Sequence, residues 1–349
     1  MHIMEALHSI RTHPVEIDKK SIMKQLARFR QAEAKRSIWQ LINTLLPYGI
    51  LWGMIIFLLQ QGYSVGIILP FILLAGLFLV RIFIIFHDCC HGSFFQSHKS
   101  NKIWGYITGV LTLTPYYQWR RDHALHHATA GNLDQRGYGD VWTMTVEEYQ
   151  RATPLRRLGY RLYRNPLILL GLGPVYKFVL AQRFPGKNTG KRERKSVWVT
   201  NAFLLGIMVV AMFSIGLKNY LFIQIAVMMF GGMLGVWLFY IQHQFEGVYW
   251  AREEQWDSLK ASLQGSSYYH LPKVLQWISG NIGIHHIHHM EPRIPNYNLQ
   301  RCYDEMPVFQ TVKPLTFMES LRSIGMNLWD EENQKLVSFR SLKKQPAGD

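Results

Sequence analysis

Three short windows of this sequence are unusually rich in histidine. Residues 87–91 read HDCCH, residues 123–127 read HALHH and residues 285–289 read HHIHH, so the windows hold two, three and four of the fifteen histidines. Neutral imidazole is a common protein ligand for zinc, copper, iron and nickel. The windows therefore predict a metal site, and the ligand type alone leaves these metals as alternatives.

The spacing within each window suits a helix that presents several imidazoles on one face. His87 and His91 are four residues apart, and the other two windows each place three histidines at i, i+3 and i+4. His243 follows directly after an apolar run and joins the set. The predicted metal ligands are His87, His91, His123, His126, His127, His243, His285, His288 and His289. A structural zinc site closes with four ligands, so nine imidazoles predict two ions with four or five nitrogens each.

The remaining histidines have no such pattern. His286 points to the opposite helical face from its neighbours, which predicts a second-shell or surface role. We expect an ordinary surface or hydrogen-bonded role for the others, namely His2, His8, His13, His98 and His270.

The elements that must position these histidines include four long apolar runs. Charged residues make up only 17% of the chain, against about 25% in a typical soluble protein. A bilayer core needs about 20 apolar residues as helix. The runs 41–60, 66–86, 197–217 and 220–241 meet that length. Tight turns at 61–65 and 218–219 would join them into two helical hairpins.

The distribution of basic residues predicts the orientation of these hairpins. The chain has 38 Lys and Arg against 23 Asp and Glu, a formal charge of +15, yet Lys218 is the one basic residue in the two turns. The positive-inside rule places both termini and the middle segment in the cytoplasm. We predict an all-α membrane protein of four transmembrane helices, with a cytoplasmic helical cap that carries the histidine windows.

The chain 1–349 is thus predicted to be one membrane domain. Its parts are a cytoplasmic or interfacial N-terminus at 1–40, a first hairpin at 41–86, a cytoplasmic segment at 87–196, a second hairpin at 197–242 and a cytoplasmic segment at 243–349. The stretches 20–36, 103–117 and 165–181 are predicted to be interfacial helices. Arg81, inside the second run, is expected to snorkel to the cytoplasmic surface, with pairing to Asp88 as the alternative.

The three windows resemble the HxxxH, HxxHH and HxxHH boxes of the integral-membrane fatty acid desaturases, over nearly the whole chain. Longer stretches, namely RIFIIFHDCCHGSFF, HHATAGNLDQRGYGDVW and GNIGIHHIHH followed by EPRIPNYNL, resemble the acyl-lipid desaturases of bacilli. The resemblance implies a di-iron centre held by the nine histidines and the use of O2. It also implies a membrane phospholipid acyl chain as substrate, desaturated at the Δ5 position in the plasma membrane.

This chemistry needs electrons from outside the chain. Cleaving an unactivated C–H bond requires a redox metal and O2, and the reaction consumes two electrons. The sequence has no HPGG heme box and no CxxC iron–sulfur pattern. The resemblance implies a separate ferredoxin or flavodoxin as donor, and the positive charge of the cytoplasmic face would attract an acidic protein.

Several residues near the boxes are candidates for supporting roles. The carboxylates Asp88, Asp122, Asp140 and Glu246 are predicted to hydrogen-bond the ligand imidazoles in the second shell, with Asp134 as a further candidate. Ordinary capping or solvation is the alternative for each. The tryptophans Trp119 and Trp142 are predicted to line the substrate channel, with interfacial anchoring as the alternative.

Other functions fit the sequence less well. A nucleic-acid-binding protein would explain the positive charge but not the apolar runs. A metal transporter would place ionisable ligands within its spans, and the four runs hold no histidine. A membrane di-iron hydroxylase of alkyl or lipid substrates remains the nearest alternative, because it shares the first hydrogen abstraction with a desaturase.

Overall fold

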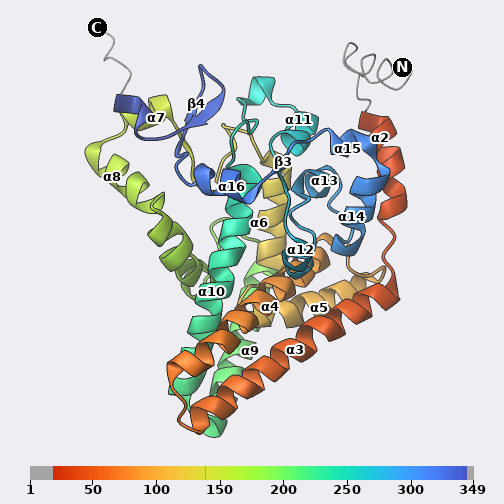
Figure 1. Cartoon of the computed structure of the whole chain (residues 1–349), viewed down its shortest axis with the longest axis vertical. Coiled ribbons are helices and arrows are strands. Elements are labelled where there is room, and N and C mark those ends of the chain that lie inside the picture. Colours follow the sequence, from red (N-terminus) through yellow and green to blue (C-terminus); the bar gives the residue numbers. More distant parts are fainter. Residues whose placement is uncertain (1–18, 138, 344–349) are drawn as a thin grey trace.

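The structure, a computed structural model, describes residues 19–137 and 139–343 and is dominated by four long helices (Figure 1). These helices are α3 (Ala34–Gln60), α4 (Val65–His91), α9 (Lys191–Ser214) and α10 (Leu217–His243). Each is long and apolar enough to cross a membrane by length and composition. The prediction of four spans is therefore confirmed.

Two tight connections join these helices into the predicted hairpins. The chain turns between Gln60 and Val65, and again at Gly216, whose φ of +82° is in the left-handed region that favours glycine. The second turn lies earlier than the predicted turn at 218–219, so Lys218 belongs to the first turn of α10. Local hydropathy misplaced this boundary, because the polar residues Lys218 and Asn219 lie inside the first turn of α10 and not in the turn between the helices.

Helix α4 lies at the centre of the bundle and packs closely against α10. A Cβ added to Gly231 would lie 2.8 Å from the Gly76 carbonyl oxygen, so the two backbones touch where these glycines meet. Ile68, Ile72 and Ile223 belong to the buried cluster around this contact. The close packing fixes the ends of α4 and α10 relative to each other, and both ends carry predicted metal ligands.

The cap, as we call the rest of the described chain, consists of short helices and two small sheets, most of which lie above the four long helices (Figure 1). Its α-helices are α2 (Lys19–Leu26), α5 (His98–Leu111), α6 (Tyr116–Thr129), α7 (Val146–Arg151), α8 (Pro154–Tyr163), α11 (Ser258–Leu263), α12 (Lys273–Ile278), α13 (His285–Met290), α14 (Asn296–Glu305), α15 (Pro307–Gln310) and α16 (Phe317–Ser323). Its 3₁₀ turns are η1 (Ala27–Phe29), η4 (Ala181–Arg183), η5 (Glu253–Gln255) and η6 (Ser341–Lys343), and its π-helical turns are η2 (Leu167–Leu172) and η3 (Val175–Leu180).

The two sheets join segments that are distant in the sequence. In the first sheet β1 (Met144–Thr145) pairs in parallel with β4 (Leu328–Asp330), and β4 pairs antiparallel with β5 (Lys335–Val337). In the second, β2 (Tyr268–Tyr269) pairs in parallel with β3 (Pro314–Leu315). The sheets therefore tie the C-terminal part of the cap to the segments that flank the second and third histidine windows.

The prediction of one interfacial helix over 20–36 was wrong. Helix α2 ends at Leu26, and α3 begins only at Ala34, after one 3₁₀ turn and four residues that are not helical. The apolar face does not turn toward lipid, because Leu26 and Phe29 are fully buried in a cluster with Ile287 and Leu299 of the cap. An amphipathic helix can bury its face against protein or membrane, and the sequence does not distinguish the two.

The other two predicted interfacial segments are helical but interrupted. The run 103–117 divides at Leu113, whose φ is +55°, so that α5 ends before it and α6 begins after it. The run 165–181 forms the two π-helical turns η2 and η3. Their position relative to a bilayer stays a prediction.

Arg81 neither reaches the surface nor pairs with Asp88. Its side chain is buried, Nε donates to Thr44 Oγ1 at 3.0 Å, and the guanidinium stacks 3.8 Å from the Trp277 ring while also donating to the Trp277 carbonyl. Both alternatives from the sequence were therefore wrong. Trp277 lies almost two hundred residues away, so no local pattern indicated this partner.

Candidate metal centre

Four helices bring the nine predicted ligands together where the cap meets the long helices. Helix α4 continues through His91 and ends at Gly92, whose φ of +72° closes the helix in the left-handed conformation. Helix α10 ends at His243 in the same region. The other ligands come from α6 and α13. The Tyr116 hydroxyl donates to the Cys89 carbonyl at 3.0 Å and so fixes the start of α6 against α4.

The nine histidines form two separate groups, each with its candidate ligand nitrogens within 4.8 Å of one another. The five-histidine group consists of His87, His91, His123, His127 and His288. The four-histidine group consists of His126, His243, His285 and His289. Each group could hold one metal ion, and the second and third windows each contribute to both.

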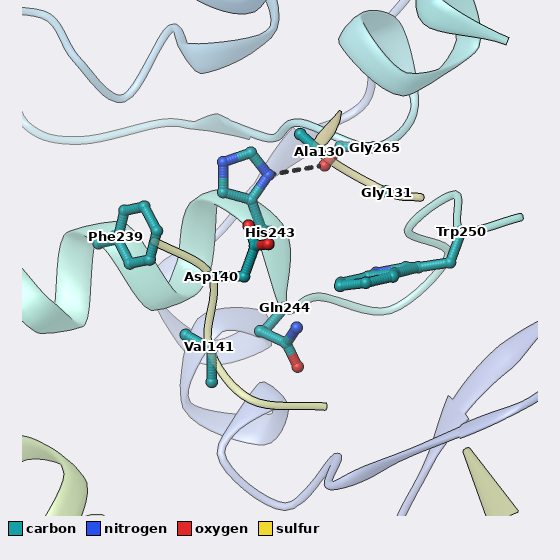
Figure 2. Close-up of a pocket in the computed structure, with 9 residues that line it drawn as sticks. All are labelled: Ala130, Gly131, Asp140, Val141, Phe239, His243, Gln244, Trp250 and Gly265. Atoms are coloured by element: carbon teal, nitrogen blue, oxygen red, sulfur yellow. Dashed lines mark hydrogen bonds between the residues drawn. The ribbon is translucent and has the colours of Figure 1, made fainter. Parts of the chain in front are cut away.

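The hydrogen bonds of the rings test whether the residues fit a metal. His126 Nδ1 lies 2.7 Å from Asp140 Oδ1. His243 Nδ1 lies 3.1 Å from the Gly265 carbonyl oxygen (Figure 2). Both partners accept, so both Nδ1 atoms must donate. The two Nε2 atoms then carry lone pairs, yet they face each other at 3.1 Å. Two ligands about 2.1 Å from one ion lie about 3 Å apart, so the arrangement fits a shared cation.

The other rings show the same pattern. His243 Nε2 lies 3.1 Å from His285 Nε2, and His127 Nε2 lies 3.1 Å from the Nε2 atoms of both His123 and His288. His91 Nε2 and His289 Nε2 are buried with no hydrogen-bond partner among the described residues. Buried polar nitrogens normally have a partner, and a metal ion would supply one.

Burial favours the neutral form of five of the imidazoles. The pKa values of His123, His127, His285, His288 and His289 lie well below the usual range, first because of burial and then because of neighbouring imidazoles. A neutral imidazole offers the lone pair that a metal requires. The two groups differ in exposure: all four rings of the four-histidine group are buried, whereas His91, His123 and His127 are half-buried.

Two of the four carboxylates that were predicted to hydrogen-bond ligand imidazoles do contact one. Asp88 Oδ1 lies 3.1 Å from His87 Nδ1, and its Oδ2 accepts from the backbone N–H and the side-chain amide of Asn296 at 2.7 and 2.8 Å. Asp140 holds His126, as described above. Sequence reasoning missed Asn296 and the Gly265 carbonyl, because a backbone carbonyl has no sequence signature and Asn296 lies outside the windows.

The other predicted carboxylates lie elsewhere. Asp122 pairs with Arg121 at 3.4 Å, and Glu246 is exposed. Asp134 accepts from the backbone N–H of Glu253 and pairs with Arg252. No hydrogen bond joins any of the three to a histidine within residues 19–137 and 139–343. The prediction that these three carboxylates hydrogen-bond ligand imidazoles was wrong, because closeness in sequence does not determine which way a side chain points.

The two predicted channel tryptophans also differ. Trp119 stacks on His123 with ring centroids 4.2 Å apart and lies 5.8 Å from His87. Trp142 is 40% exposed and packs on Tyr160 and Tyr163 of α8. Only Trp119 is therefore placed beside the metal groups.

Three described histidines outside the predicted set, namely His98, His270 and His286, belong to neither group. His98 and His270 are exposed, whereas His2, His8 and His13 lie outside the described residues. His286 is fully buried and its ring contacts Tyr268 and Phe309, so it is not a surface residue and packs against aromatic rings instead of a ligand imidazole. Burial lowers the pKa of His286 to about 4.

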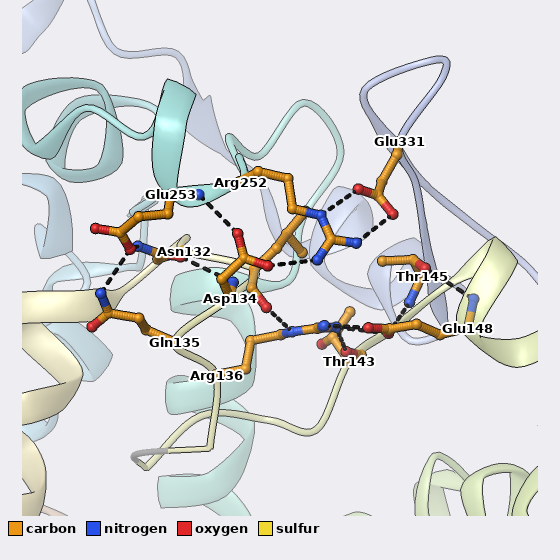
Figure 3. Close-up of polar contacts among 11 residues, drawn as sticks. Asn132, Asp134, Gln135, Arg136, Thr143, Thr145, Glu148, Arg252, Glu253 and Glu331 are labelled. Atoms are coloured by element: carbon orange, nitrogen blue, oxygen red, sulfur yellow. Dashed lines mark hydrogen bonds and ion pairs between the residues drawn. The ribbon is translucent and has the colours of Figure 1, made fainter.

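A network of ion pairs fixes the loop that carries Asp140 (Figure 3). Arg136 donates to the carbonyls of Leu133 and Thr143 and pairs with Glu148. Arg252 joins the same region to the C-terminal hairpin through Glu331, at 2.7 Å. The network thus holds both ends of the short segment from which Asp140 reaches His126.

Comparisons with known proteins agree with this site. The family model described as fatty acid desaturase matches residues 65–317. The chain is 44% identical to a "Fatty acid desaturase" of Bacillus subtilis (strain 168), over 94% of this chain and 93% of that protein. It is 26% identical to a "sn-1 acyl-lipid omega-3 desaturase (ferredoxin)" of Nostoc sp. (strain 36), over 86% of this chain and 82% of that protein. It is 27% identical to a "sn-1 oleoyl-lipid 12-desaturase" of Synechocystis sp., over 66% of each.

Proposed function

The chain belongs to the fatty acid desaturase family, and we propose that it is an acyl-lipid desaturase with nine histidines as the ligands of a di-iron centre. It inserts a cis double bond, at the Δ5 position, into saturated acyl chains of membrane phospholipids. It uses O2 and two electrons. Each turnover removes two hydrogens from adjacent methylenes, takes up two electrons and two protons, and reduces O2 to two waters.

The division of the nine histidines into two groups carries this proposal. Two ions held by these imidazoles would supply the redox chemistry with O2 that cleaves an unactivated C–H bond. The relatives point to the same substrate class, because two of them are named for acyl-lipid or oleoyl-lipid desaturation.

The residues of this chain hold and orient the ligands. Asp88 and Asp140 accept the Nδ1 protons of His87 and His126, and the Gly265 carbonyl accepts that of His243. Each acceptor directs Nε2 of its ring into the site and increases its basicity. The burial of the four-histidine group excludes water, which limits loss of a reactive oxidant to side reactions.

Electrons come from a separate soluble donor, a ferredoxin or flavodoxin. One relative is named for ferredoxin, and the charge of +15 on this chain would attract an acidic protein to its cytoplasmic side. We place the enzyme in the plasma membrane, with both termini and the metal centre in the cytoplasm. The basic residues outside the two short turns support that orientation.

Product analysis tests the proposed function. The chain would be expressed in a bacterium with a competent ferredoxin or flavodoxin, and fatty acid methyl esters would be derivatised at their double bonds for mass spectrometry. We expect new Δ5 monoenes with the wild-type chain and with His98→Ala, and none with His288→Ala. Double bonds at another carbon would overturn the Δ5 position. Hydroxylated chains would identify a hydroxylase instead, and activity retained in His288→Ala would overturn the ligand assignment.

A further inference from the structure

Helix α8 turns its apolar face away from the rest of the protein. Leu155, Leu158 and Leu162 lie at i, i+3 and i+7 and share one side of the helix, which we call the leucine face. Their side chains are 79%, 54% and 49% exposed, whereas Tyr160 on the opposite side is fully buried. In Figure 1, α8 lies at the left edge, and no other described element lies outside it. An amphipathic helix ordinarily buries its apolar stripe, so the leucine face requires a partner from outside the described chain.

The end of α8 lies at the level where α10 leaves its apolar run. Arg164, the residue that follows α8, donates to the Tyr240 hydroxyl and to Gln244 Oε1, each at 3.1 Å. Tyr240 lies in the last turn of the apolar run 220–241, where the span reaches the membrane surface. After α8 the chain continues into η2, where Leu169 packs in a cluster with Tyr240. A bilayer that surrounds α10 therefore reaches the start of this segment as well.

The segment around α8 carries positive charge without an acidic residue to balance it. Residues 152–187 contain seven Lys and Arg and no Asp or Glu. On α8, Arg156 is exposed, while Arg157 and Arg161 donate to a backbone carbonyl and to a tyrosine hydroxyl, which are neutral partners. Within residues 19–137 and 139–343, none of these three arginines pairs with a carboxylate. Arginines beside an apolar face suit the phosphate headgroups of an anionic lipid surface.

The inward side of α8 holds the segment that follows Asp140. The Tyr163 hydroxyl accepts from the backbone N–H of Trp142, and the Tyr160 hydroxyl accepts from the backbone N–H of Met144, each at 3.1 Å. Asp140 itself contacts a ligand of the four-histidine group, as described above. The placement of α8 is therefore linked to that group through two backbone hydrogen bonds and a short stretch of chain.

We propose that α8 lies on the surface of an anionic bilayer, with the leucine face among the acyl chains and the arginines of α8 at the lipid phosphates, and that this contact positions the Trp142–Met144 segment. The bilayer is favoured as the partner because the leucine face continues from the end of a span, so no separate docking event is needed. The basic charge beside the face is complementary to anionic lipid. The inference concerns the cap and the membrane, and it does not depend on the reaction at the metal centre.

Fluorescence quenching tests the membrane contact. The full chain with Leu158→Cys would carry an environment-sensitive fluorophore in nanodiscs that hold one chain each, in about 3:1 phosphatidylcholine and phosphatidylglycerol. The natural cysteines are buried, so the fluorophore attaches to the new one. We expect a lipid with a nitroxide near the top of its acyl chain to quench this fluorophore about fivefold more than one at Lys260→Cys, an exposed position of α11. Aqueous iodide should show the reverse order.

The lipid charge tests the role of the arginines. Replacing phosphatidylglycerol with phosphatidylcholine should reduce nitroxide quenching at Leu158→Cys about twofold, because the attraction to anionic headgroups is lost. Arg156→Gln should reduce it in the anionic nanodiscs, whereas Lys335→Gln, at an exposed position of β5, should not. Quenching that is independent of lipid charge and of Arg156 would overturn the assignment of the phosphates to these arginines.

Hydrogen exchange tests whether the contact positions the segment after Asp140. Leu158→Glu places a charge on the leucine face and should raise the exchange rates of the Trp142 and Met144 amides about tenfold in the anionic nanodiscs. Gln255→Glu places the same charge at an exposed position of η5 and should leave both rates within twofold of wild type. Unchanged exchange in Leu158→Glu would show that the membrane does not position this segment.

Two quenching results would overturn the membrane contact itself. Equal quenching by iodide at Leu158→Cys and Lys260→Cys would place the leucine face in water. Protection of Leu158→Cys from both quenchers would show that protein covers the face instead of lipid. If the wild-type chain formed no double bond, the proposed function would fail, but the quenching comparison would still decide whether α8 lies on the bilayer.

Discussion

The Nε2 atoms of His126 and His243 lie 3.1 Å apart although each ring donates its Nδ1 proton to another acceptor. Two lone pairs at that distance repel each other unless a cation lies between them. The helices α6 and α10 therefore converge in an arrangement that is favourable only with a metal bound, and metal binding should contribute to the stability of the cap.

Asp140→Asn should weaken metal binding by the four-histidine group. An amide oxygen is a weaker acceptor than a carboxylate, so His126 would be less firmly oriented and less basic. Loss of such a partner typically costs 10–100-fold in metal affinity or activity. We expect about half of the iron to be lost on dialysis against a mild chelator, measured by inductively coupled plasma mass spectrometry. The control is Glu246→Gln, because Glu246 is exposed. Equal iron retention in both variants would contradict the assignment.

His285→Ala and His286→Ala should have opposite effects although the residues are adjacent. His285 Nε2 faces His243, so its loss should remove iron and activity. His286 is buried among aromatic rings, so its loss should leave a cavity that lowers the unfolding temperature by several degrees. Iron stoichiometry and thermal unfolding in detergent measure the two effects. Two irons per chain in His285→Ala, or iron loss confined to His286→Ala, would reverse our assignment of the α13 faces.

The Arg136–Glu148 pair should make stability depend on pH on the acid side. Burial raises the pKa of Glu148, but the hydrogen bonds from Arg136 and the Thr145 N–H outweigh it, and the pKa is lowered overall. The contribution is therefore present above the unfolded pKa of about 4.3 and is lost as pH falls through the lower folded value.

Arg136→Met should lower the unfolding temperature by a few degrees at pH 7. The further fall in unfolding temperature below about pH 4.5 should be smaller in this variant than in the wild type. Thermal unfolding in detergent between about pH 3.5 and 7 measures both effects. Arg151→Met is the control, because the Arg151–Glu147 pair is largely exposed. If the unfolding temperature of Arg136→Met fell with acidification as steeply as that of the wild type, the Arg136–Glu148 pair would not be the cause of the pH dependence.

Cysteine labelling should reveal the orientation in the membrane. The three natural cysteines are buried, so background labelling should be low. A membrane-impermeant maleimide should label Gln61→Cys, in the turn between α3 and α4, in intact cells. It should label Lys187→Cys, before α9, only after permeabilisation. The reverse pattern would place the metal centre outside the cell.

The sequence alone was sufficient to predict the spans and the candidate ligands, because both depend on patterns within short stretches of the chain. A run of about 20 apolar residues indicates a span wherever it occurs, and histidines at i, i+3 and i+4 share a helical face in any fold. The four spans were confirmed, and all nine histidines lie in the two groups. The boundaries were less accurate, as the turn at Gly216 shows.

Only the tertiary structure decided which residues contact one another. His126 and His127 are adjacent in the chain but belong to different metal groups, because neighbouring positions on α6 face different partner helices. Asp140 reaches a ligand fourteen residues away, whereas Asp122, next to His123, does not contact one. Arg81 finds Trp277, and Phe178 finds Phe83, across long separations in sequence. Such contacts depend on how helices pack and where the chain turns, and that information is spread over the whole chain.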